Sequence, residues 1–252
     1  MGLLQKVLSR LRARSAPVIL QSSGVCPTCN RPTQFIARDP WLRDHFLCRR
    51  CGSLPRERAL MVVVDELYPN WRELRIHESS PADRGASRRL AAECPNYLAT
   101  QYFPDVALGQ SRDGLRCESL EALTFADQSF DLHITQDVLE HVFHPERVFS
   151  EIARTLKSGG AHICTVPLVR GSAPSRPRAV HDADGMIQHL EPPEYHGNPI
   201  SERGSLVTMD WGFDICEHVQ RSSGLTTTIE RIDDLGKGIR AEYIEVLVMK
   251  KD

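Results

Sequence analysis

The sequence predicts an α/β fold in which helices cover both faces of a mostly parallel sheet, preceded by a small metal-binding module. The run from Phe130 to Thr135 is apolar and β-branched and follows Asp-Gln-Ser, as a buried strand does. A proline-led helical pattern comes next, and Ala161 to Val166 is a second apolar run. Strand, helix and strand in this order predict a right-handed βαβ unit. Two C-x-x-C pairs near the start predict the module.

The helix of the βαβ unit is predicted to begin at Pro145, because proline is tolerated in a first helical turn. Its apolar residues recur at helical spacing and give it one apolar face. They are Val148, Phe149, Ile152 and Leu156. We expect Ser158-Gly159-Gly160 to end this helix, since glycine is the usual residue of a left-handed C-terminal cap.

Length and composition allow one large domain plus a small module, since the chain has 252 residues of which 41% are hydrophobic. The longest apolar run, Ala59 to Val64, is far shorter than a membrane span. Lysine and arginine interrupt the apolar residues at the start, unlike a signal peptide. We therefore expect a cytoplasmic location.

The net charge of −2 hides an asymmetry, because residues 1–58 carry a balance of +8 and the remainder a balance of −10. A basic front on an acidic body is typical of proteins with an anionic partner such as RNA or a phosphorylated glycan. The simpler interpretation, which we favour, is that the two parts attract each other and dock.

Residues 1–20 are predicted to form an amphipathic basic helix. Its apolar face would hold Leu3, Leu4, Val7, Leu8 and Leu11. We expect this helix to pack on its own domain, with attachment to a membrane surface as the alternative.

Residues 21–55 are predicted to form a zinc ribbon. Two C-x-x-C pairs, Cys26 with Cys29 and Cys48 with Cys51, stand at the spacing of a four-thiolate Zn²⁺ site. Four thiolates fill a tetrahedral shell and leave no open position, so the ion is assigned a structural role. The other four cysteines are expected to be buried, small apolar residues.

The stretch from Phe130 to Pro167 resembles the fourth-strand to fifth-strand region of class I S-adenosylmethionine-dependent methyltransferases of the type 11 kind. The resemblance rests on the pattern FDL-x5-VLEHV, the proline-led helix and the Leu-Lys-x-Gly-Gly exit. Its flanking pattern runs from about Leu74 to Val248. The resemblance implies a Rossmann-like, seven-stranded, mostly parallel sheet over residues 56–252, with S-adenosylmethionine as the cofactor.

The resemblance also implies which residues hold the cofactor. Strands are expected at Leu74 to His77 and Tyr97 to Tyr102, but the glycine-rich turn usual after the first strand is missing. A ribbon-bearing subset of the family has an L-H-x-A-P turn there instead, similar to Ile76 to Pro81. The implied cofactor-binding residues are His77, Glu78, Ser79, Ser80, Gln101, Glu118, Ser119, Leu120 and Gln136.

Asp137, Glu140 and His141 are the candidate catalytic residues. If their segment is helical, the three side chains share one face at the carboxyl edge of the sheet. They could bind Mg²⁺, as in some quinone O-methyltransferases with a similar segment, or His141 could act as a general base. Alternatively, Glu140 and His141 merely tie the loop to neighbouring backbone.

Residues 168–204 lack periodicity and are predicted to form a substrate or lid loop. Within it, Tyr195 and His196 are the candidate acceptor contacts. A helix is expected from Asp210 to Ser222, followed by a closing pair of strands at Leu225 to Arg231 and Ile239 to Met249.

The sequence is therefore compatible with three functions. We favour transfer of a methyl group from S-adenosylmethionine to an oxygen or nitrogen of a small-molecule or glycan acceptor. The first alternative is an RNA methyltransferase that uses the basic zinc-bearing front. The second is a non-catalytic binding protein on a methyltransferase fold, because Ser79-Ser80, Gln101 and Ser119 replace the usual cofactor contacts. The acceptor itself is not identified by any residue pattern.

Overall fold

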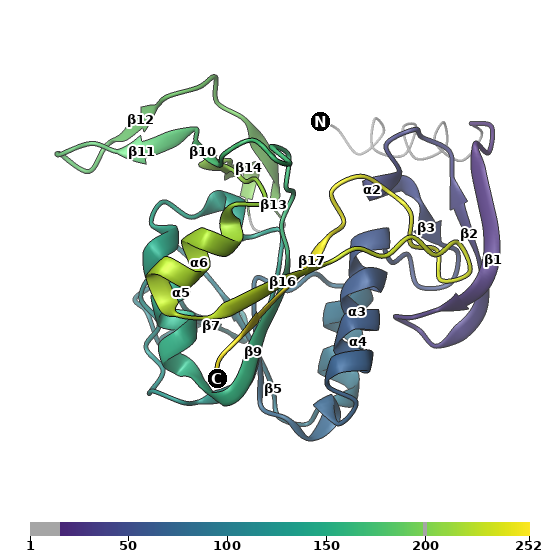
Figure 1. Ribbon diagram of the computed structural model, residues 1–252, viewed down its shortest axis with the longest axis horizontal. Helices are drawn as coiled ribbons and strands as arrows, with labels where there is room; N and C mark the ends of the chain where they lie inside the picture. Colours follow the sequence, from purple (N-terminus) through teal and green to yellow (C-terminus); the bar gives the residue numbers. More distant parts are fainter. Residues whose placement is uncertain (1–15, 199–200) are drawn as a thin grey trace.

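The structure, a computed structural model, describes residues 16–198 and 201–252 (Figure 1). Most of the predicted N-terminal helix therefore lies outside the described residues. Within the described residues, no helix is long and apolar enough to cross a membrane.

One large sheet of eight strands forms the centre of the molecule, in the order β16-β17-β9-β8-β4-β5-β7-β6. The strands are β4 (Ile76–Ser79), β5 (Tyr97–Gln101), β6 (Ser111–Arg112), β7 (Leu115–Cys117), β8 (Phe130–Gln136), β9 (Leu156–Thr165), β16 (Thr226–Glu230) and β17 (Val246–Lys250). Strands β4, β5, β7, β8 and β9 are parallel, and β17 runs antiparallel to both of its neighbours. The predicted fold class and the mostly parallel sheet are confirmed.

The eighth strand is β6, a two-residue edge strand beyond the seven that the resemblance implies. It pairs back on β7 through Asp113 and Gly114, which have φ values of 54° and 81°. Positive φ at both central residues is the geometry of a two-residue Asp-Gly hairpin turn. The Asp-Gly pair was therefore the sequence signal for this strand.

Helices cover both faces of the sheet (Figure 1). The helices on the two faces are α3 (Pro55–Leu67), α4 (Gly85–Glu93), α5 (Pro145–Thr155) and α6 (Ile215–Ser223). The short helix α2 (Leu42–His45) belongs to the cysteine-bearing module, and η1 (Trp71–Glu73) and η2 (Leu139–His141) are 3-10 turns. Helices α3 and α4 share one apolar core with Val246 and Val248 of β17. Helices α5 and α6 share the other with Leu247 and Met249. Alternate residues of β17 thus face opposite layers, as the pleat of a strand requires.

Helix α5 begins at Pro145 as predicted but ends at Thr155, before the glycines. Leu156 is extended and pairs with Phe130 of β8, so sheet pairing ends the helix early. Gly159, with φ of 76°, lies inside β9, where the register with β8 shifts. The left-handed residue therefore accommodates an irregularity in a strand and does not cap a helix.

The cysteine-bearing module is a three-stranded antiparallel sheet of β1 (Leu20–Cys26), β2 (Arg31–Ala37) and β3 (Leu47–Cys48). Its small core contains Phe35 and Phe46. Arg58 of α3 is fully buried and donates to the carbonyls of Phe46 and Gly238 at 2.7 and 2.6 Å. The module is thus fastened to the loop that precedes β17.

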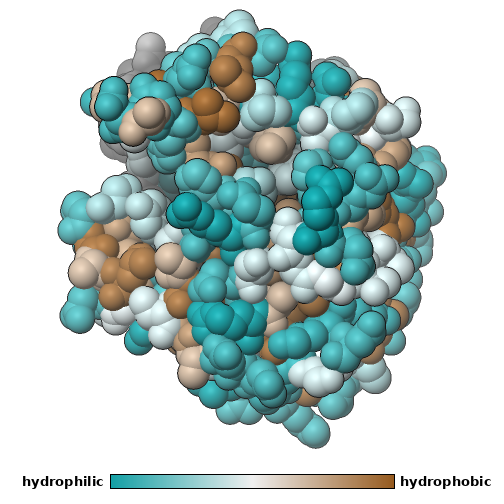
Figure 2. Space-filling view, turned by 60° about the vertical axis from the view of Figure 1, so that its left-hand side comes forward, coloured by the Kyte–Doolittle hydropathy of each residue, from teal (hydrophilic) through white to brown (hydrophobic). Residues whose placement is uncertain are grey.

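The predicted irregular loop of residues 168–204 is folded into short strand pairs that project from one end of the sheet (Figure 1). The pairs are β10 (Arg176–Pro177) with β15 (Met209–Asp210), β11 (Ala179–His181) with β12 (Ile187–His189), and β13 (Tyr195–Asn198) with β14 (Ser201–Leu206). Because residues 209–210 belong to β15, helix α6 begins only at Ile215 and not at Asp210. The face shown in Figure 2 is mostly hydrophilic, with small separate apolar patches.

Candidate functional site

The strand order reverses between β4 and β8. From β4 the chain continues to β5 and β7 on one side, and then returns to β8 and β9 on the other. In open parallel sheets, ligands bind outside the carboxyl ends of the strands at this switch point. Strands β4 and β8 end at Ser79 and Gln136, so these ends define where a cofactor is expected.

A buried carboxylate organises the switch point. Glu78 accepts hydrogen bonds from Ser87 Oγ at 2.6 Å, Tyr97 Oη at 2.7 Å and Gln136 Nε2 at 2.8 Å. Burial raises the pKa of Glu78, and the three donors partly oppose that shift. The second side-chain atom of Gln136, Oε1, is buried and has no hydrogen-bond partner. It is therefore an acceptor left open for a ligand at this edge.

The turn after β4 replaces the missing glycines with two left-handed residues. Ser80 has φ of 57° and donates its backbone N–H to Thr100 O at 2.8 Å. Gly85, with φ of 53°, begins α4 directly beside the carboxylate of Glu57, and a Cβ there would lie 2.1 Å from Glu57 Oε2. Close approach at this turn thus depends on Gly85.

His77 does not lie in this turn, because β4 extends two residues beyond the predicted strand. Leu74 instead follows η1, and the strand begins at Ile76. The His77 ring is buried inside the protein, with Nδ1 2.8 Å from His133 Nδ1 and Nε2 2.8 Å from Thr100 Oγ1. Burial lowers the pKa of His77 to about 3. The structure therefore places this predicted cofactor contact away from the sheet edge.

The other implied cofactor residues lie at the ends of β5 and β7. Gln101 is the last residue of β5, and its backbone carbonyl accepts from Glu118 N. The Glu118 carboxylate is already bound by Arg116 Nε at 2.6 Å and Thr124 N at 2.8 Å. Leu120 is buried, and Ser119 opens the turn before it. The side chain of Gln101 therefore makes fewer close hydrogen bonds within the protein than the carboxylate of Glu118.

Asp137 is separated from the other two candidate catalytic residues. Its φ is 54°, so the chain leaves β8 in a left-handed turn instead of a helix. Its carboxylate is held by Arg43 Nη2 at 2.8 Å, Arg56 Nε at 2.7 Å and Thr165 Oγ1 at 3.1 Å. Burial would raise the pKa of Asp137, but the guanidinium groups of Arg43 and Arg56 outweigh it and hold the pKa below its usual range.

Glu140, His141 and His196 come together on the far side of that turn. The three offer ligand atoms within 4.8 Å of one another. Glu140 Oε1 lies 3.8 Å from His141 Nε2 and 3.6 Å from His196 Nδ1. The carboxylate raises the pKa of His196. Of the predicted set Asp137, Glu140 and His141, only the last two converge, and the third member comes from β13.

Backbone contacts fix this cluster. Glu140 lies in η2, and its carbonyl accepts from Thr208 N at 2.8 Å. Trp211 Nε1 donates to Leu139 O at 3.0 Å, and His141 Nδ1 is 2.8 Å from Leu206 O. The segment after β14 therefore holds η2 against the sheet edge. The His141 side chain thus ties the loop to neighbouring backbone, whereas Glu140 does so only through its own backbone carbonyl.

A cleft of about 220 Å³ opens beside the cluster. It is lined by Glu140, Pro167, Val169, Arg178, Glu194, His196, Val207, Met209 and Asp210. His196 thus lines the cleft as an acceptor contact would, whereas Tyr195 is 54% exposed and is not part of the lining. The sequence did not point to Arg178, which follows β10, or to Asp210 of β15, whose side chains pair at 3.2 Å. The arginines at 176 and 178 were the only local signal.

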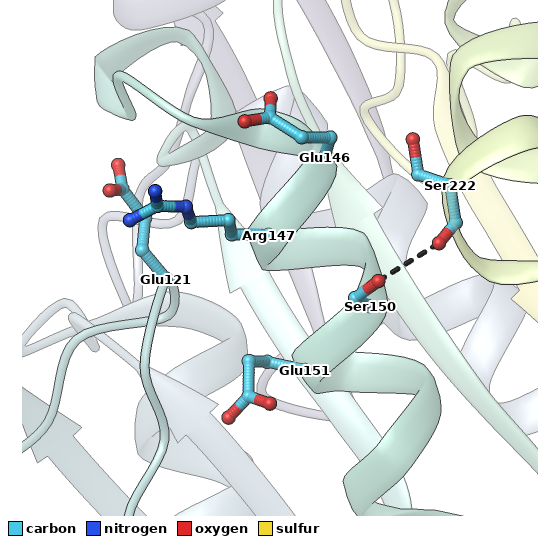
Figure 3. Close-up of a pocket in the computed structure, with 6 residues that line it drawn as sticks. All are labelled: Glu121, Glu146, Arg147, Ser150, Glu151 and Ser222. Atoms are coloured by element: carbon cyan, nitrogen blue, oxygen red, sulfur yellow. Dashed lines mark hydrogen bonds between the residues drawn. The ribbon is translucent and has the colours of Figure 1, made fainter.

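A second hollow, of about 300 Å³, lies at α5 (Figure 3). It is lined by Glu121, Glu146, Arg147, Ser150, Glu151 and Ser222. Ser150 Oγ donates to Ser222 O at 2.9 Å, and Glu121 accepts the backbone N–H of Phe143. Its lining holds none of the buried unpartnered polar atoms found in the described residues, so it carries no chemistry comparable to the cleft.

The four cysteines of the module lie together. Cys26, Cys29, Cys48 and Cys51 offer sulfur atoms within 4.8 Å of one another and form no disulfide. Cys26 Sγ and Cys51 Sγ are 3.8 Å apart. Four sulfurs at this separation fit a tetrahedral Zn²⁺ site, in which each Zn–S bond is about 2.3 Å.

Residues 87–164 match the family model described as "Methyltransferase domain". This segment runs from α4 through β9 and includes the ends of β5 and β8 at the switch point. No curated protein matches the chain.

Several solved structures are similar to the chain. An S-adenosylmethionine-dependent methyltransferase from Mesorhizobium loti is 20% identical, covering 76% of this chain and 96% of its own, with a TM-score of 0.45. The PH0226 protein from Pyrococcus horikoshii is 15% identical, with 77% and 87% covered and a TM-score of 0.45. The 1,6-didemethyltoxoflavin-N1-methyltransferase from Burkholderia thailandensis is 15% identical, with 78% and 79% covered and a TM-score of 0.42.

Proposed function

We propose that this chain, a class I S-adenosylmethionine-dependent methyltransferase, moves the cofactor's methyl group to an oxygen or nitrogen of a small-molecule or glycan acceptor. The match to the methyltransferase domain and the sheet order support the activity. The cleft beside Glu140 carries the proposal for the acceptor, because it is small, at about 220 Å³, and its lining includes Glu140 and His196.

The switch point fits the cofactor. S-adenosylmethionine supplies a methyl group already activated on a positive sulfur, so the protein mainly has to position the two reactants. Gln136 offers an unpartnered buried acceptor, and Ser79 and Ser80 are small enough for close approach. Gln101, at the end of β5, would accept one ribose hydroxyl. The carboxylate of Glu118 is already hydrogen-bonded within the protein. Glu118 would therefore contribute mainly to the shape of the site around the cofactor's adenine.

The cluster of Glu140, His141 and His196 would take up the acceptor's proton. His141 Nδ1 faces the Leu206 carbonyl, so it carries the hydrogen and leaves Nε2 basic. Glu140 raises the pKa of His196 and would stabilise its protonated form. Arg178 and Asp210 in the cleft wall provide one donor and one acceptor for orienting a polar acceptor.

Structural zinc in the four-cysteine module would support this site indirectly. The module carries Arg43, which binds Asp137 at the end of β8. An ordered module would therefore fix the edge of the sheet where acceptor and cofactor meet. We assign the zinc no part in methyl transfer, since four thiolates leave no open position.

The docked module also bears on the RNA alternative. Arg43, Arg56 and Arg58 belong to the basic front, and all three bind groups of the protein itself. These three arginines dock the module and are not available to bind RNA phosphates. This favours the small acceptor over RNA. The non-catalytic alternative is tested by titration of the protein with S-adenosylmethionine.

A labelled-cofactor screen tests the acceptor proposal. Purified protein is incubated with methyl-labelled S-adenosylmethionine and a cell extract, separated into small molecules, glycans and RNA. We expect label in the small-molecule or glycan fraction, reduced at least about 100-fold by E140Q, because general acid–base groups contribute factors of this size. H189A, which changes an exposed histidine of β12, is the matched control and should label like wild type. Label confined to ribonuclease-sensitive material would replace the proposal with the RNA alternative.

A further inference from the structure

The cluster beside the cleft has the geometry of a metal site. Glu140, His141 and His196 each offer one ligand atom, and the three atoms lie within 4.8 Å of one another. The two carboxylate–imidazole separations are 3.6 and 3.8 Å, longer than hydrogen bonds. Ligands at about 2.0–2.2 Å from one tetrahedral ion lie roughly 3.3–3.6 Å apart, so these two separations are close to those of bound ligands.

Glu140 supplies an independent observation. The residue is 1% exposed, and both of its carboxylate oxygens are buried without a hydrogen-bond partner. A buried ionised carboxylate is costly unless it is paired or coordinates a metal. Glu140 is the only carboxylate in the described residues that has both oxygens in this state. Neither carboxylate oxygen of Glu140 therefore has a hydrogen-bond donor among the described residues, which leaves both oxygens available to an ion.

Each of the two histidines has a protein oxygen near the ring nitrogen that faces away from Glu140. His141 Nδ1 lies 2.8 Å from Leu206 O, which leaves Nε2 facing Glu140. His196 Nε2 lies 3.5 Å from Glu194 Oε1, which leaves Nδ1 facing Glu140. A ligating histidine almost always directs its other nitrogen to a carbonyl or a carboxylate, which sets its tautomer and orientation. His141 has such a partner at hydrogen-bond distance, and for His196 the Glu194 carboxylate lies nearby at 3.5 Å.

From this geometry we infer that Glu140, His141 and His196 bind one divalent transition-metal ion, of which Zn²⁺ is the best match. Two imidazoles and one carboxylate are a donor set for zinc and its neighbours, whereas Mg²⁺ prefers oxygen ligands in an octahedron. The site also differs from the expected Mg²⁺ set, because Asp137 is bound by Arg43 and Arg56 and does not join it.

The ion would keep one coordination position open toward the cleft, since three protein ligands leave a tetrahedral shell incomplete. An acceptor hydroxyl bound there would have a lowered pKa and lose its proton more readily. With the ion bound, the two imidazoles are ligands, so that proton would pass to solvent in the cleft and not to them. The ion would also clamp β13 to η2, because His196 belongs to the first and the other two ligands to the second. What the ion does in catalysis rests on the proposed function, but whether it binds does not.

The test counts zinc in the full-length protein. Wild type, E140Q, H196A and H189A are dialysed to equilibrium against ZnCl₂, and zinc per chain is measured by plasma mass spectrometry. We expect wild type and H189A to hold one zinc more than E140Q and H196A, with the four-cysteine zinc unchanged in all four. His196 is half-buried on a hairpin, so H196A should fold even if E140Q does not, which circular dichroism and thermal unfolding would establish.

Equal zinc in wild type and H196A would overturn the inference. Labelled methyl transfer and cofactor binding are measured separately on the same preparations. Zinc at the cluster without methyl transfer would contradict the proposed function and leave the metal site standing. Methyl transfer without zinc at the cluster would contradict the metal site and leave the proposed function standing.

Discussion

Asp137 at the end of β8 and Arg43 of the cysteine-bearing module share two hydrogen bonds, of 2.8 and 3.0 Å, between the carboxylate and the guanidinium. Arg56 adds a third contact at 2.7 Å, and Arg43 Nε also donates to Tyr243 O. The exposed fractions of the Arg43, Arg56 and Asp137 side chains are 8%, 13% and 17%. The module and the sheet edge are thus joined by a largely buried ionic network next to the candidate site.

Replacement of Asp137 by Asn should therefore destabilise the protein. Arg43 would lose its carboxylate partner and Arg56 would lose one of its two, the other being Asp44. Removal of one partner of a buried pair costs about 3 kcal/mol. The free energy of unfolding is measured in urea. D105N is the control, because Asp105 pairs with Arg112 on the surface with 72% of its side chain exposed. Surface pairs contribute about 0–1 kcal/mol, so D105N should be close to wild type.

A different result for D137N would support a catalytic role for Asp137. A D137N protein as stable as wild type that lost methyl transfer would show that the carboxylate acts in the reaction and not in docking.

Gly85 should tolerate alanine poorly. Its φ of 53° and its contact with Glu57 both oppose a Cβ, and moving Glu57 would break its hydrogen bonds with Leu54 N and Arg84. We expect G85A to lower the free energy of unfolding by about 2 kcal/mol, from backbone strain plus a lost capping bond. G114A has a φ of 81° but open space, so it isolates the strain and should cost only about 1 kcal/mol.

The same pair of variants tests the turn after β4. G85A should also weaken S-adenosylmethionine binding, whereas G114A should not. Equal losses of stability in the two variants would contradict the close approach of Glu57.

Buried histidines should make the fold sensitive to acid. His162 is fully buried, its Nδ1 has no partner, and burial lowers its pKa to about 3. The unfolded chain, with a pKa of about 6.5, binds a proton that the folded chain does not, so stability falls as the pH drops from about 6.5 towards 3. One such histidine gives a slope of up to about 1.4 kcal/mol per pH unit.

H162F should remove that contribution. The loss of stability between about pH 7 and pH 4.5, measured by urea unfolding, should be about 2.5 kcal/mol smaller than in wild type. H189F changes an exposed histidine and should leave the pH dependence unaltered. An H162F protein with the wild-type slope would mean that His162 is charged in the fold.

Loss of one cysteine ligand should release the structural zinc. C26S is expected to hold one zinc fewer than wild type and to unfold at a lower temperature, because zinc binding contributes to folding. C216S alters a cysteine outside the cluster and should keep its zinc. Stoichiometric zinc retained by C26S would exclude the ribbon assignment.

The fold was largely predictable because local patterns carry it. The βαβ unit of residues 130–167 and the cysteine spacing each specify an element directly. Boundaries that depend on distant pairing were not predictable: β4 begins at Ile76 because it pairs with Leu132 of β8, and the two-residue shift moves His77 out of the turn. The short strands of residues 168–204 likewise pair with partners that no local periodicity marks.

The site was predictable only in part for the same reason. Glu140 and His141 follow the strand that the sequence identifies. His196 reaches them from another hairpin, and Asp137 is removed from them by its left-handed backbone and by Arg43. Neither the hairpin contact nor the ion pair leaves a trace in sequence spacing.

Calorimetric titration of the purified protein with S-adenosylmethionine tests the central claim most directly. Wild type should bind one cofactor per chain, and Q136A should bind more weakly, because the open acceptor at the switch point would be lost. Q188A, which changes an exposed residue of β12, should bind like wild type. Heat of binding that follows this pattern is the result we predict. Absence of binding at millimolar cofactor would contradict methyltransferase activity in this chain.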